Sequence, residues 1–232
     1  MKYRYFLFDL DNTLWDFDGN AADCISELVL RHGLQEYVPD PGHFYDMYKS
    51  NNTRLWAMYE AGQITQQKLR HVRFEITLEE AGVPDAVRLG TVFGEAYLDL
   101  MPLKTKLIPH AREVLGYLAG KGCEMALVTN GFKQVQYDKV RNCGLDLFFG
   151  NRIFISEEVG YHKPNPKMFT AAITSINGKK KDTLMVGDNF MTDIEGAQVF
   201  GIDQFYYNPN NLPCDGAPTY MGSDLRDLKD LA

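Results

Sequence analysis

The chain has 232 residues, of which 45% are hydrophobic, enough to build one α/β domain with an insertion or two modest domains. Its 31 acidic and 24 basic residues give a formal net charge of -7. No run of Lys and Arg forms the basic stripe of a nucleic-acid-binding surface, so a nucleic acid polymer is not an expected partner.

The cysteines and the hydrophobic segments indicate the compartment. The cysteines lie far apart, without a CxxC pair or histidines at metal-binding spacing, which is typical of buried or incidental thiols in a reducing compartment: Cys24, Cys123, Cys143 and Cys214. The first apolar run, Tyr5 to Phe8, is too short for a signal-peptide core. No stretch approaches the roughly 20 apolar residues that cross a bilayer. We therefore expect a cytoplasmic protein without membrane contact, either a monomer or a weak homodimer.

The first predicted element is a buried strand that is followed directly by two aspartates. Residues Tyr3 to Leu10 form a short aromatic and aliphatic run, typical of a parallel strand, which ends in Asp9-Leu10-Asp11-Asn12-Thr13. From about residue 18 to residue 101 the pattern turns helical, with apolar stripes at helical spacing. Three glycines mark expected helix ends: Gly33, Gly62 and Gly82. These features predict an all-helical insertion over residues 17–102.

The rest of the chain alternates strands and helices in the manner of βαβ units. Strand-like runs are expected at Met125–Val128, Ile153–Ile155, Leu184–Val186 and near Gln204–Tyr207. A short amphipathic helix is expected near Asp224–Leu231. This alternation predicts an α/β fold with a Rossmann-like parallel sheet and helices on both of its faces, built from residues 1–16 and 103–232.

Polar residues follow several of these strands, which predicts where a ligand binds. In an open parallel sheet with helices on both faces, ligands bind outside the carboxyl ends of the strands. Five polar residues are therefore expected to converge at one rim: Asp9, Asp11, Thr129, Asn130 and Asp188. The helical insertion leaves the core directly after the first strand, so it should lie above that rim as a cap and act as a lid.

Asp9 and Asp11 are the first candidates for chemistry. In extended backbone, residues two apart point the same way, so both carboxylates can face one ligand. Two carboxylates this close repel each other, and a divalent cation relieves the repulsion. Mg²⁺ prefers such oxygen ligands, and Asp188 can supply a further carboxylate. The structural alternative is that each aspartate merely caps a strand end. Their pairing after a buried strand favours function.

Four further residues have both a structural and a functional interpretation. Asp193 is placed to cap the helix that follows Asp188, or to accept hydrogen bonds from a lysine or from metal-bound water. Thr129 and Asn130 precede Gly131, which lets the backbone approach phosphate oxygens closely at a helix N-terminus. Most single lysines are solvated, so a role for Lys163 in neutralising phosphate depends on its neighbours.

Together these elements resemble the haloacid dehalogenase superfamily of phosphohydrolases, over nearly the whole core and in the family's order. The four motifs are Asp9-Leu10-Asp11-Asn12-Thr13-Leu14, Thr129-Asn130-Gly131, Lys163, and Gly187-Asp188 followed by Thr192-Asp193. Asn12 stands where many relatives have Gly, and Asn tolerates left-handed backbone better than most residues. Family members that dehalogenate generally lack the second carboxylate, so Asp11 and Asp188 argue against a dehalogenase.

The resemblance implies a role for each motif residue. Asp9 is the nucleophile, which forms an aspartyl-phosphate, and Asp11 is the general acid/base. Mg²⁺ is bound by Asp9, by the backbone carbonyl of Asp11 and by Asp188, with Asp193 in support. Thr129, Asn130 and Lys163 bind the phosphate. The substrate is a small phosphate monoester, because the helical cap resembles the type that closes over small molecules.

Further segments resemble the nucleotidase branch of this family, which acts on nucleoside 5'-monophosphates, often pyrimidine ones. They are Thr129-Asn130-Gly131-Phe132 and the stretch from Ile155 to Gly160 that leads into Lys163-Pro164-Asn165. Trp15 and Phe17 follow the first motif and are candidates to stack on a base, although packing against the first cap helix explains them equally well. No histidine is assigned a catalytic role.

Three alternatives stay open at this point. Another metabolite, such as phosphoglycolate or a sugar phosphate, can be the substrate of the same chemistry. A phosphomutase would use the same core and return the phosphoryl group to a sugar phosphate. A non-catalytic phosphate sensor is a different class of protein, and the presence of every motif carboxylate argues against it.

Overall fold

The computed structural model describes residues 2–214 and 216–232, and the chain divides into two compact units. One unit consists of residues 1–17 and 105–232, and the other of residues 18–104. The sequence-predicted boundaries at 16/17 and 102/103 thus have counterparts at 17/18 and 104/105. Each unit is described by itself below.

The first unit is built on a six-stranded parallel sheet in the order β3-β2-β1-β4-β5-β6. The strands are β1 (Tyr5–Phe8), β2 (Glu124–Thr129), β3 (Ile153–Ile155), β4 (Thr183–Gly187), β5 (Asp203–Tyr207) and β6 (Tyr220–Gly222). In the register, Leu7 lies opposite Ala126 on one side and Met185 on the other. The chain runs from β1 out to β3 and then returns to β4, so the carboxyl end of β1 lies at the point where the strand order reverses.

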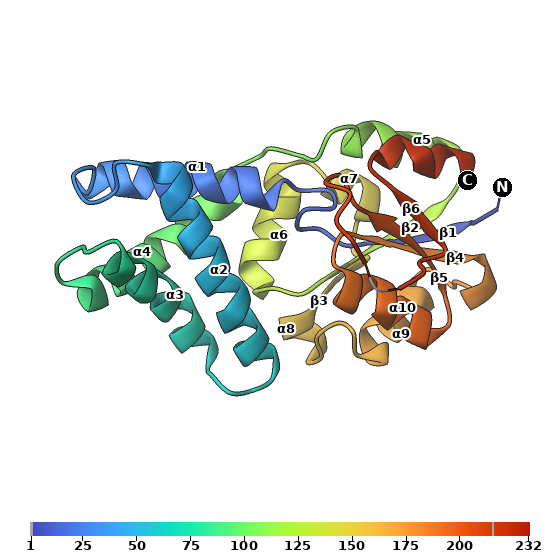
Figure 1. Ribbon diagram of the computed structural model, residues 1–232. Coiled ribbons are helices and arrows are strands. Elements are labelled where there is room, and N and C mark those ends of the chain that lie inside the picture. Colours follow the sequence, from blue (N-terminus) through green and yellow to red (C-terminus); the bar gives the residue numbers. More distant parts are fainter. Residues whose placement is uncertain (1, 215) are drawn as a thin grey trace. The chain divides into compact units, whose positions relative to one another are not determined.

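Helices cover both faces of this sheet, as Figure 1 shows, and the predicted α/β fold is confirmed. They are α5 (Ala111–Gly120), α6 (Lys133–Asn142), α7 (Asp146–Phe149), α8 (Ser156–Val159), α9 (Pro166–Ser175), the π-helical η3 (Phe190–Glu195) and α10 (Gly196–Phe200). Alternate residues of β1 point to opposite faces. Leu7 packs with Met168 and Phe169 of α9, whereas Phe8 meets Phe149 of α7 with ring centroids 6.2 Å apart.

Short elements account for the differences from the predicted pattern. The 3-10 helix η2 (Lys180–Asp182) directly precedes β4. The amphipathic helix predicted near Asp224–Leu231 is also a 3-10 helix, η4 (Leu225–Asp230). The edge strand β6 was not predicted. It contributes three residues, none of them fully buried, and therefore lacks the apolar run that marks the other strands.

The second unit is all-helical, as predicted for the cap. It contains α2 (Pro41–Glu60), α3 (Gln66–Glu80), α4 (Ala86–Leu100), the 3-10 helix η1 (Met101–Leu103) and all but the first residue of α1 (Phe17–Arg31). The carboxylate of Asp40 accepts backbone hydrogen bonds at the start of α2, and Thr65 does so for α3. Gly33, Gly62 and Gly82, the predicted helix ends, each follow a helix and have positive φ.

Close packing of α3 and α4 holds the helical unit together. A Cβ on Gly90 would lie 2.7 Å from the backbone nitrogen of Glu75, and one on Gly94 would lie 2.7 Å from the carbonyl oxygen of Arg70. Glycine is therefore required at both positions for the two helices to approach this closely. The core beside them is aromatic, with Tyr48 and Phe74 stacked 4.9 Å apart.

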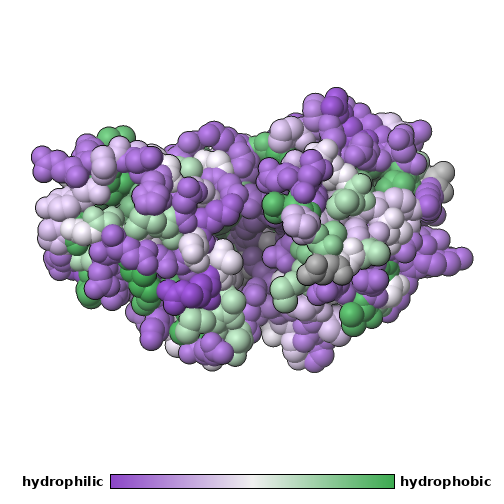
Figure 2. All heavy atoms as spheres, in the orientation of Figure 1, coloured by the Kyte–Doolittle hydropathy of each residue, from purple (hydrophilic) through white to green (hydrophobic). Residues whose placement is uncertain are grey.

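Figure 2 shows mainly hydrophilic residues on the visible face, with hydrophobic ones scattered between them. Within residues 2–214 and 216–232, no helix has both the length and the apolar character that a membrane span requires.

Candidate active site

Asp9 lies at the end of β1 in a buried cluster of charged side chains. Its Oδ1 atom accepts a hydrogen bond from the Lys163 ammonium at 2.6 Å. The same ammonium lies 2.7 Å from the Oδ1 atom of Asp193. Only 2% of the Lys163 side chain is exposed, so this lysine is held between the two carboxylates. Lys163 is therefore not solvated, unlike most single lysines.

Asp188 completes an acidic group at the ends of the strands. One carboxylate oxygen from each of Asp9, Asp188 and Asp193 lies within 4.8 Å of the others. Asp188 follows β4 directly, and its Oδ1 atom accepts a hydrogen bond from the Thr13 hydroxyl at 3.2 Å. The carboxylates thus come from segments that the parallel sheet brings to one edge.

The charges of this cluster are not balanced by the protein alone. With all three carboxylates ionised, the cluster and its one ammonium would carry a net charge of -2, which one divalent cation would neutralise. Burial raises the pKa of Asp9 to about 7, with Lys163 lowering it and Asp193 raising it. Burial and the neighbouring Asp9 and Asp193 also raise the pKa of Asp188 well above its ordinary value. The donor set, all oxygen, fits Mg²⁺.

Lys163 keeps its charge in this environment. Burial by itself would lower its pKa, but Asp193 and Asp9 more than offset that effect and raise the pKa above its ordinary value. An ammonium fixed beside the candidate nucleophile can neutralise a phosphoryl oxygen that approaches the same carboxylate.

Asn130 fixes the backbone of Lys163. Its side-chain oxygen accepts a hydrogen bond from the Lys163 backbone nitrogen at 2.8 Å, and its side-chain nitrogen donates to the Lys163 carbonyl at 3.0 Å. The peptide bond between Lys163 and Pro164 is cis. Because both functional ends of the Asn130 amide contact Lys163, a direct contact of this side chain with phosphate stays a prediction.

Asp193 and Gly187 fit together tightly. Asp193 lies in η3, is fully buried, and accepts a hydrogen bond from the backbone nitrogen of Asn189 at 3.2 Å. A Cβ on Gly187 would lie 2.5 Å from the Cβ of Asp193. The end of β4 therefore needs a residue without a side chain, because the carboxylate that holds Lys163 occupies that space.

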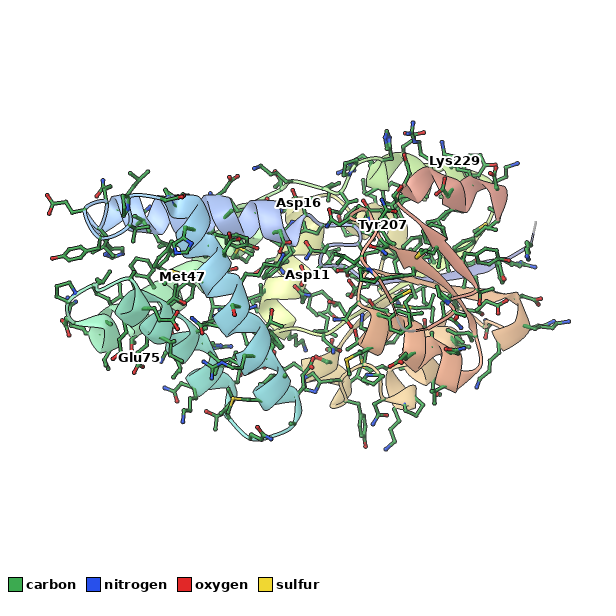
Figure 3. The ribbon with its side chains drawn as sticks, viewed as in Figure 1. Asp11, Asp16, Met47, Glu75, Tyr207 and Lys229 are labelled. Carbon is green, nitrogen blue, oxygen red and sulfur yellow. The ribbon has the colours of Figure 1, made fainter. Side chains whose placement is uncertain are left out.

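Asp11 has its own partners on helix α6, beside which it lies in Figure 3. Its Oδ1 atom lies 2.8 Å from the Lys139 ammonium, and its Oδ2 atom accepts a hydrogen bond from the Gln136 amide at 3.0 Å. The same amide nitrogen donates to the hydroxyl oxygen of Thr129 at 2.7 Å. Asn12, next to Asp11, has a φ of 59°, in the left-handed region that Asn tolerates.

Trp15 and Phe17 differ in exposure. Trp15 is fully buried, and its ring packs edge-on against that of Phe17 with an interplanar angle of 63°. Its backbone forms an isolated β-bridge with Asp11. This burial favours the packing interpretation for Trp15. Phe17 is half-buried, and its contact with a substrate stays a prediction.

Three residues of the site were not singled out from the sequence: Thr13, Gln136 and Lys139. Thr13 belongs to the first motif, and its contact with Asp188 bridges 175 positions of sequence. Gln136 and Lys139 are three apart on the helix that follows Thr129-Asn130-Gly131, a spacing that places them on one face. That spacing was the available signal, but α6 is so polar that its buried face does not stand out.

Comparison with known proteins identifies the family. Residues 3–201 match the haloacid dehalogenase-like hydrolase family. The chain is 32% identical to pyrimidine 5'-nucleotidase YjjG of Escherichia coli over 234 residues, covering 100% of this chain and 98% of that protein. It is 30% identical to pyrimidine 5'-nucleotidase PynA of Streptococcus pneumoniae over 233 residues, covering 99% and 95%.

The fold agrees with solved structures. The crystal structure of the magnesium-bound HAD-hydrolase YfnB from Bacillus subtilis superposes with a TM-score of 0.86 at 29% identity, covering 100% of this chain and 99% of that one. The L-2-haloacid dehalogenase of Xanthobacter autotrophicus has the same fold, with a TM-score of 0.74 at 18% identity. The predicted resemblance, and the prediction of a hydrolase similar to 5'-nucleotidases, are confirmed. The protein belongs to the haloacid dehalogenase-like hydrolase family.

Proposed function

We propose that this protein hydrolyses small phosphate monoesters through an aspartyl-phosphate on Asp9, with Mg²⁺ as cofactor and nucleoside 5'-monophosphates as its main substrates. The observation that carries the proposal is the buried ion pair of Asp9 with Lys163, at 2.6 Å, within a cluster of three carboxylates. A nucleophile held by a cation that also neutralises phosphate suits attack on a dianionic ester.

In the first step, a carboxylate oxygen of Asp9 attacks phosphorus and the bond from phosphorus to the ester oxygen breaks. The departing oxygen takes a proton from Asp11, so an alcohol leaves. In the second step, Asp11 takes a proton from water as the water oxygen attacks phosphorus. The bond from phosphorus to Asp9 then breaks and returns its electron pair to the carboxylate, and inorganic phosphate leaves. Asp11 ends each cycle with the proton it gave up.

Lys163 and Thr129 are the proposed phosphoryl-binding groups. The Lys163 ammonium is within reach of an oxygen on any phosphorus that Asp9 attacks, because it already touches Asp9. Thr129 is 1% exposed at the end of β2 and contributes a hydroxyl. Asn130 supports Lys163 through two hydrogen bonds to its backbone.

The proposed ligands of Mg²⁺ are Asp9, Asp188 and the backbone carbonyl of Asp11, and Asp193 holds Lys163 beside them. Burial is the largest cause of the raised pKa values of Asp9 and Asp188, and the neighbouring carboxylates add to it, so a cation among these groups would favour their ionised forms. A bound divalent cation supplies charge neutralisation for the transferring phosphoryl group.

The substrate class rests on the relatives. Two proteins that align over 99% or more of this chain are named pyrimidine 5'-nucleotidases. Another relative, 31% identical over 209 residues, is named ribulose-1,5-bisphosphate 5-phosphatase and is from Halopiger xanaduensis. A sugar phosphate is therefore the alternative substrate class.

Phosphate release from a panel of esters tests this proposal. The panel contains nucleoside monophosphates, sugar phosphates and phosphoglycolate, first with Mg²⁺ and then with EDTA. We expect magnesium-dependent release that is greatest for a pyrimidine nucleoside 5'-monophosphate. A maximum on a sugar phosphate would overturn the substrate class, and no release from any ester would overturn the hydrolytic function.

A further inference from the structure

Helix α6 places two buried polar side chains against the proposed general acid/base. Gln136 and Lys139 are 1% and 3% exposed, although both are polar and α6 carries several exposed positions. A buried lysine is unusual unless its charge is paired. Both side chains contact Asp11, so this carboxylate offsets part of the cost of burying them.

The two contacts fix the orientation of the Asp11 carboxylate. Lys139 reaches Oδ1 at 2.8 Å and Gln136 reaches Oδ2 at 3.0 Å, so each oxygen has a donor of its own. Rotation of the carboxylate about its Cβ–Cγ bond would break both hydrogen bonds. Because 26% of the Asp11 side chain is exposed, the group is held on one side and open on the other.

Gln136 links this carboxylate to the proposed phosphate-binding hydroxyl. The amide nitrogen carries two hydrogens, one for Asp11 and one for Thr129, whose hydroxyl oxygen lies 2.7 Å away. The Thr129 oxygen therefore accepts from Gln136. Its single hydroxyl hydrogen is not needed for that contact and can donate to a phosphoryl oxygen.

Aromatic rings hold Lys139 in place. Its ammonium lies 4.2 Å from the ring centroid of Trp15 and 5.4 Å from that of Phe17. Contacts of this kind attract a cation to the face of the ring. Trp15 also accepts, through its carbonyl, a hydrogen bond from the Asn12 backbone nitrogen at 2.7 Å. The loop that carries Asp11 thus also carries the ring that positions its cationic partner.

We propose that Gln136 and Lys139 are positioning residues, which hold Asp11 ready for proton transfer and aim the Thr129 hydroxyl at the phosphoryl group. This inference rests on the proposed phosphatase function. Its alternative is a purely structural ion pair that neutralises a half-buried carboxylate. The two roles predict different losses of activity in variants of these residues. Only a role in proton transfer makes the loss depend on how basic the departing oxygen is.

The test compares two esters in the variant Lys139→Met, which removes the ammonium but keeps an unbranched side chain. The leaving group of a nucleoside 5'-monophosphate is a poor one that needs a proton, whereas p-nitrophenolate can leave without one. We expect kcat/KM for the nucleotide to fall by about 10²-fold, the loss typical of a misplaced catalytic group. For p-nitrophenyl phosphate, kcat/KM should fall far less.

The second step provides an independent readout in the same variant. Water activation also requires Asp11, so dephosphorylation should become slow with either ester. With p-nitrophenyl phosphate, kcat should therefore fall, and a first-turnover burst of p-nitrophenol should precede the slow steady state. Gln136→Met should give the same pattern, and it removes no buried charge. This variant therefore tests the inference even if Lys139→Met does not fold.

Lys133→Met is the matched control, because Lys133 lies on the same helix with 53% of its side chain exposed and pairs with Glu158. We expect it to behave as the wild-type enzyme. If folded Lys139→Met and Gln136→Met lose equal kcat/KM on both esters and show no burst, the two residues have a structural role. That result would overturn this inference but not the proposed function. A wild-type enzyme that hydrolyses neither ester would instead overturn the proposed function.

Discussion

Asp9 and Asp11 lie two residues apart in the chain but have different partners. Asp9 is 7% exposed and paired with Lys163, whereas Asp11 is more accessible and paired with Lys139. Each carboxylate thus has its own lysine. The buried one suits a nucleophile in a fixed position, and the accessible one suits a group that exchanges protons with a leaving alcohol and with water.

Replacing the nucleophile tests the residue-level assignment. Asp9→Asn keeps the shape of the side chain but removes the attacking oxygen anion, so turnover should fall to background. The fold should persist, since Lys163 keeps its partner Asp193. Activity assays with circular dichroism check both points. The control is Asp182→Asn, which alters a carboxylate that lies before β4 rather than after a strand. Full activity of Asp9→Asn would contradict the assignment.

The sequence singled out the candidate site residues that follow strands, but not the two residues of α6 that contact Asp11. Asp9, Asp188 and Thr129 each come at or just after a buried apolar run, so the parallel sheet alone brings them together. Gln136 and Lys139 lie instead on a helix that is polar on nearly all sides. Only the tertiary contact with Asp11 shows which of its polar residues are buried.

At the scale of the elements, the end of β4 is the most constrained point of the site. We expect Gly187→Ala to cost about 1–3 kcal/mol of stability, because the added methyl would lie 2.5 Å from the Cβ of Asp193. Displacement of Asp193 should also loosen Lys163 and lower turnover. Urea unfolding and phosphate release measure the two effects.

A second glycine variant serves as the control for this prediction. Gly116 lies on an exposed face of α5, and a Cβ there would meet nothing within 4 Å. Gly116→Ala should therefore stabilise the helix by about 0.5–1 kcal/mol and leave turnover unchanged. Equal stability and activity in both variants would contradict the tight fit of Gly187 against Asp193.

The predicted strands were found where buried apolar runs begin and end, including the three-residue β3, whereas the edge strand β6 was missed. The run Leu184–Val186 is fully buried within β4, and an unbroken apolar run of this kind is typical of a central parallel strand. The three residues of β6 include an exposed Met221 and pair on one side with β5. Such an edge strand depends on its neighbour and leaves little trace in the sequence.

At the scale of the whole molecule, the proposed Mg²⁺ site predicts that metal binding is coupled to folding. Unfolding separates Asp9, Asp188 and Asp193, so a cation held by this cluster should bind the folded protein preferentially. At 100 times its Kd, a ligand of this kind adds about 2.7 kcal/mol of stability. For a chain of this size, we expect the unfolding temperature to rise by roughly 5–10 °C and EDTA to reverse the rise.

Asp188→Asn should abolish this magnesium-dependent shift, because it removes one carboxylate of the cluster. Asp99→Asn, at an exposed position of α4, should retain it. Thermal scans of both variants with and without Mg²⁺ make the comparison. An undiminished shift in Asp188→Asn would place the cation elsewhere.

The two-unit organisation follows from a change of sequence pattern. Helical spacing replaces the strand pattern after residue 17, and strands and helices alternate again after residue 104. The cytoplasmic location, the monomeric or weakly dimeric state and the closing of the cap stay predictions.

The covalent intermediate is the most direct test of the central claim. Asp11→Asn removes the base that activates water, so a phosphorylated enzyme should accumulate when p-nitrophenyl phosphate is supplied with Mg²⁺. Intact-mass analysis should show one added phosphoryl group, and peptide mapping should place it on Asp9. The double variant Asp9→Asn, Asp11→Asn should stay unmodified. Unimpaired turnover of Asp11→Asn without any phosphoenzyme, or a phosphoryl group on another residue, would contradict the account.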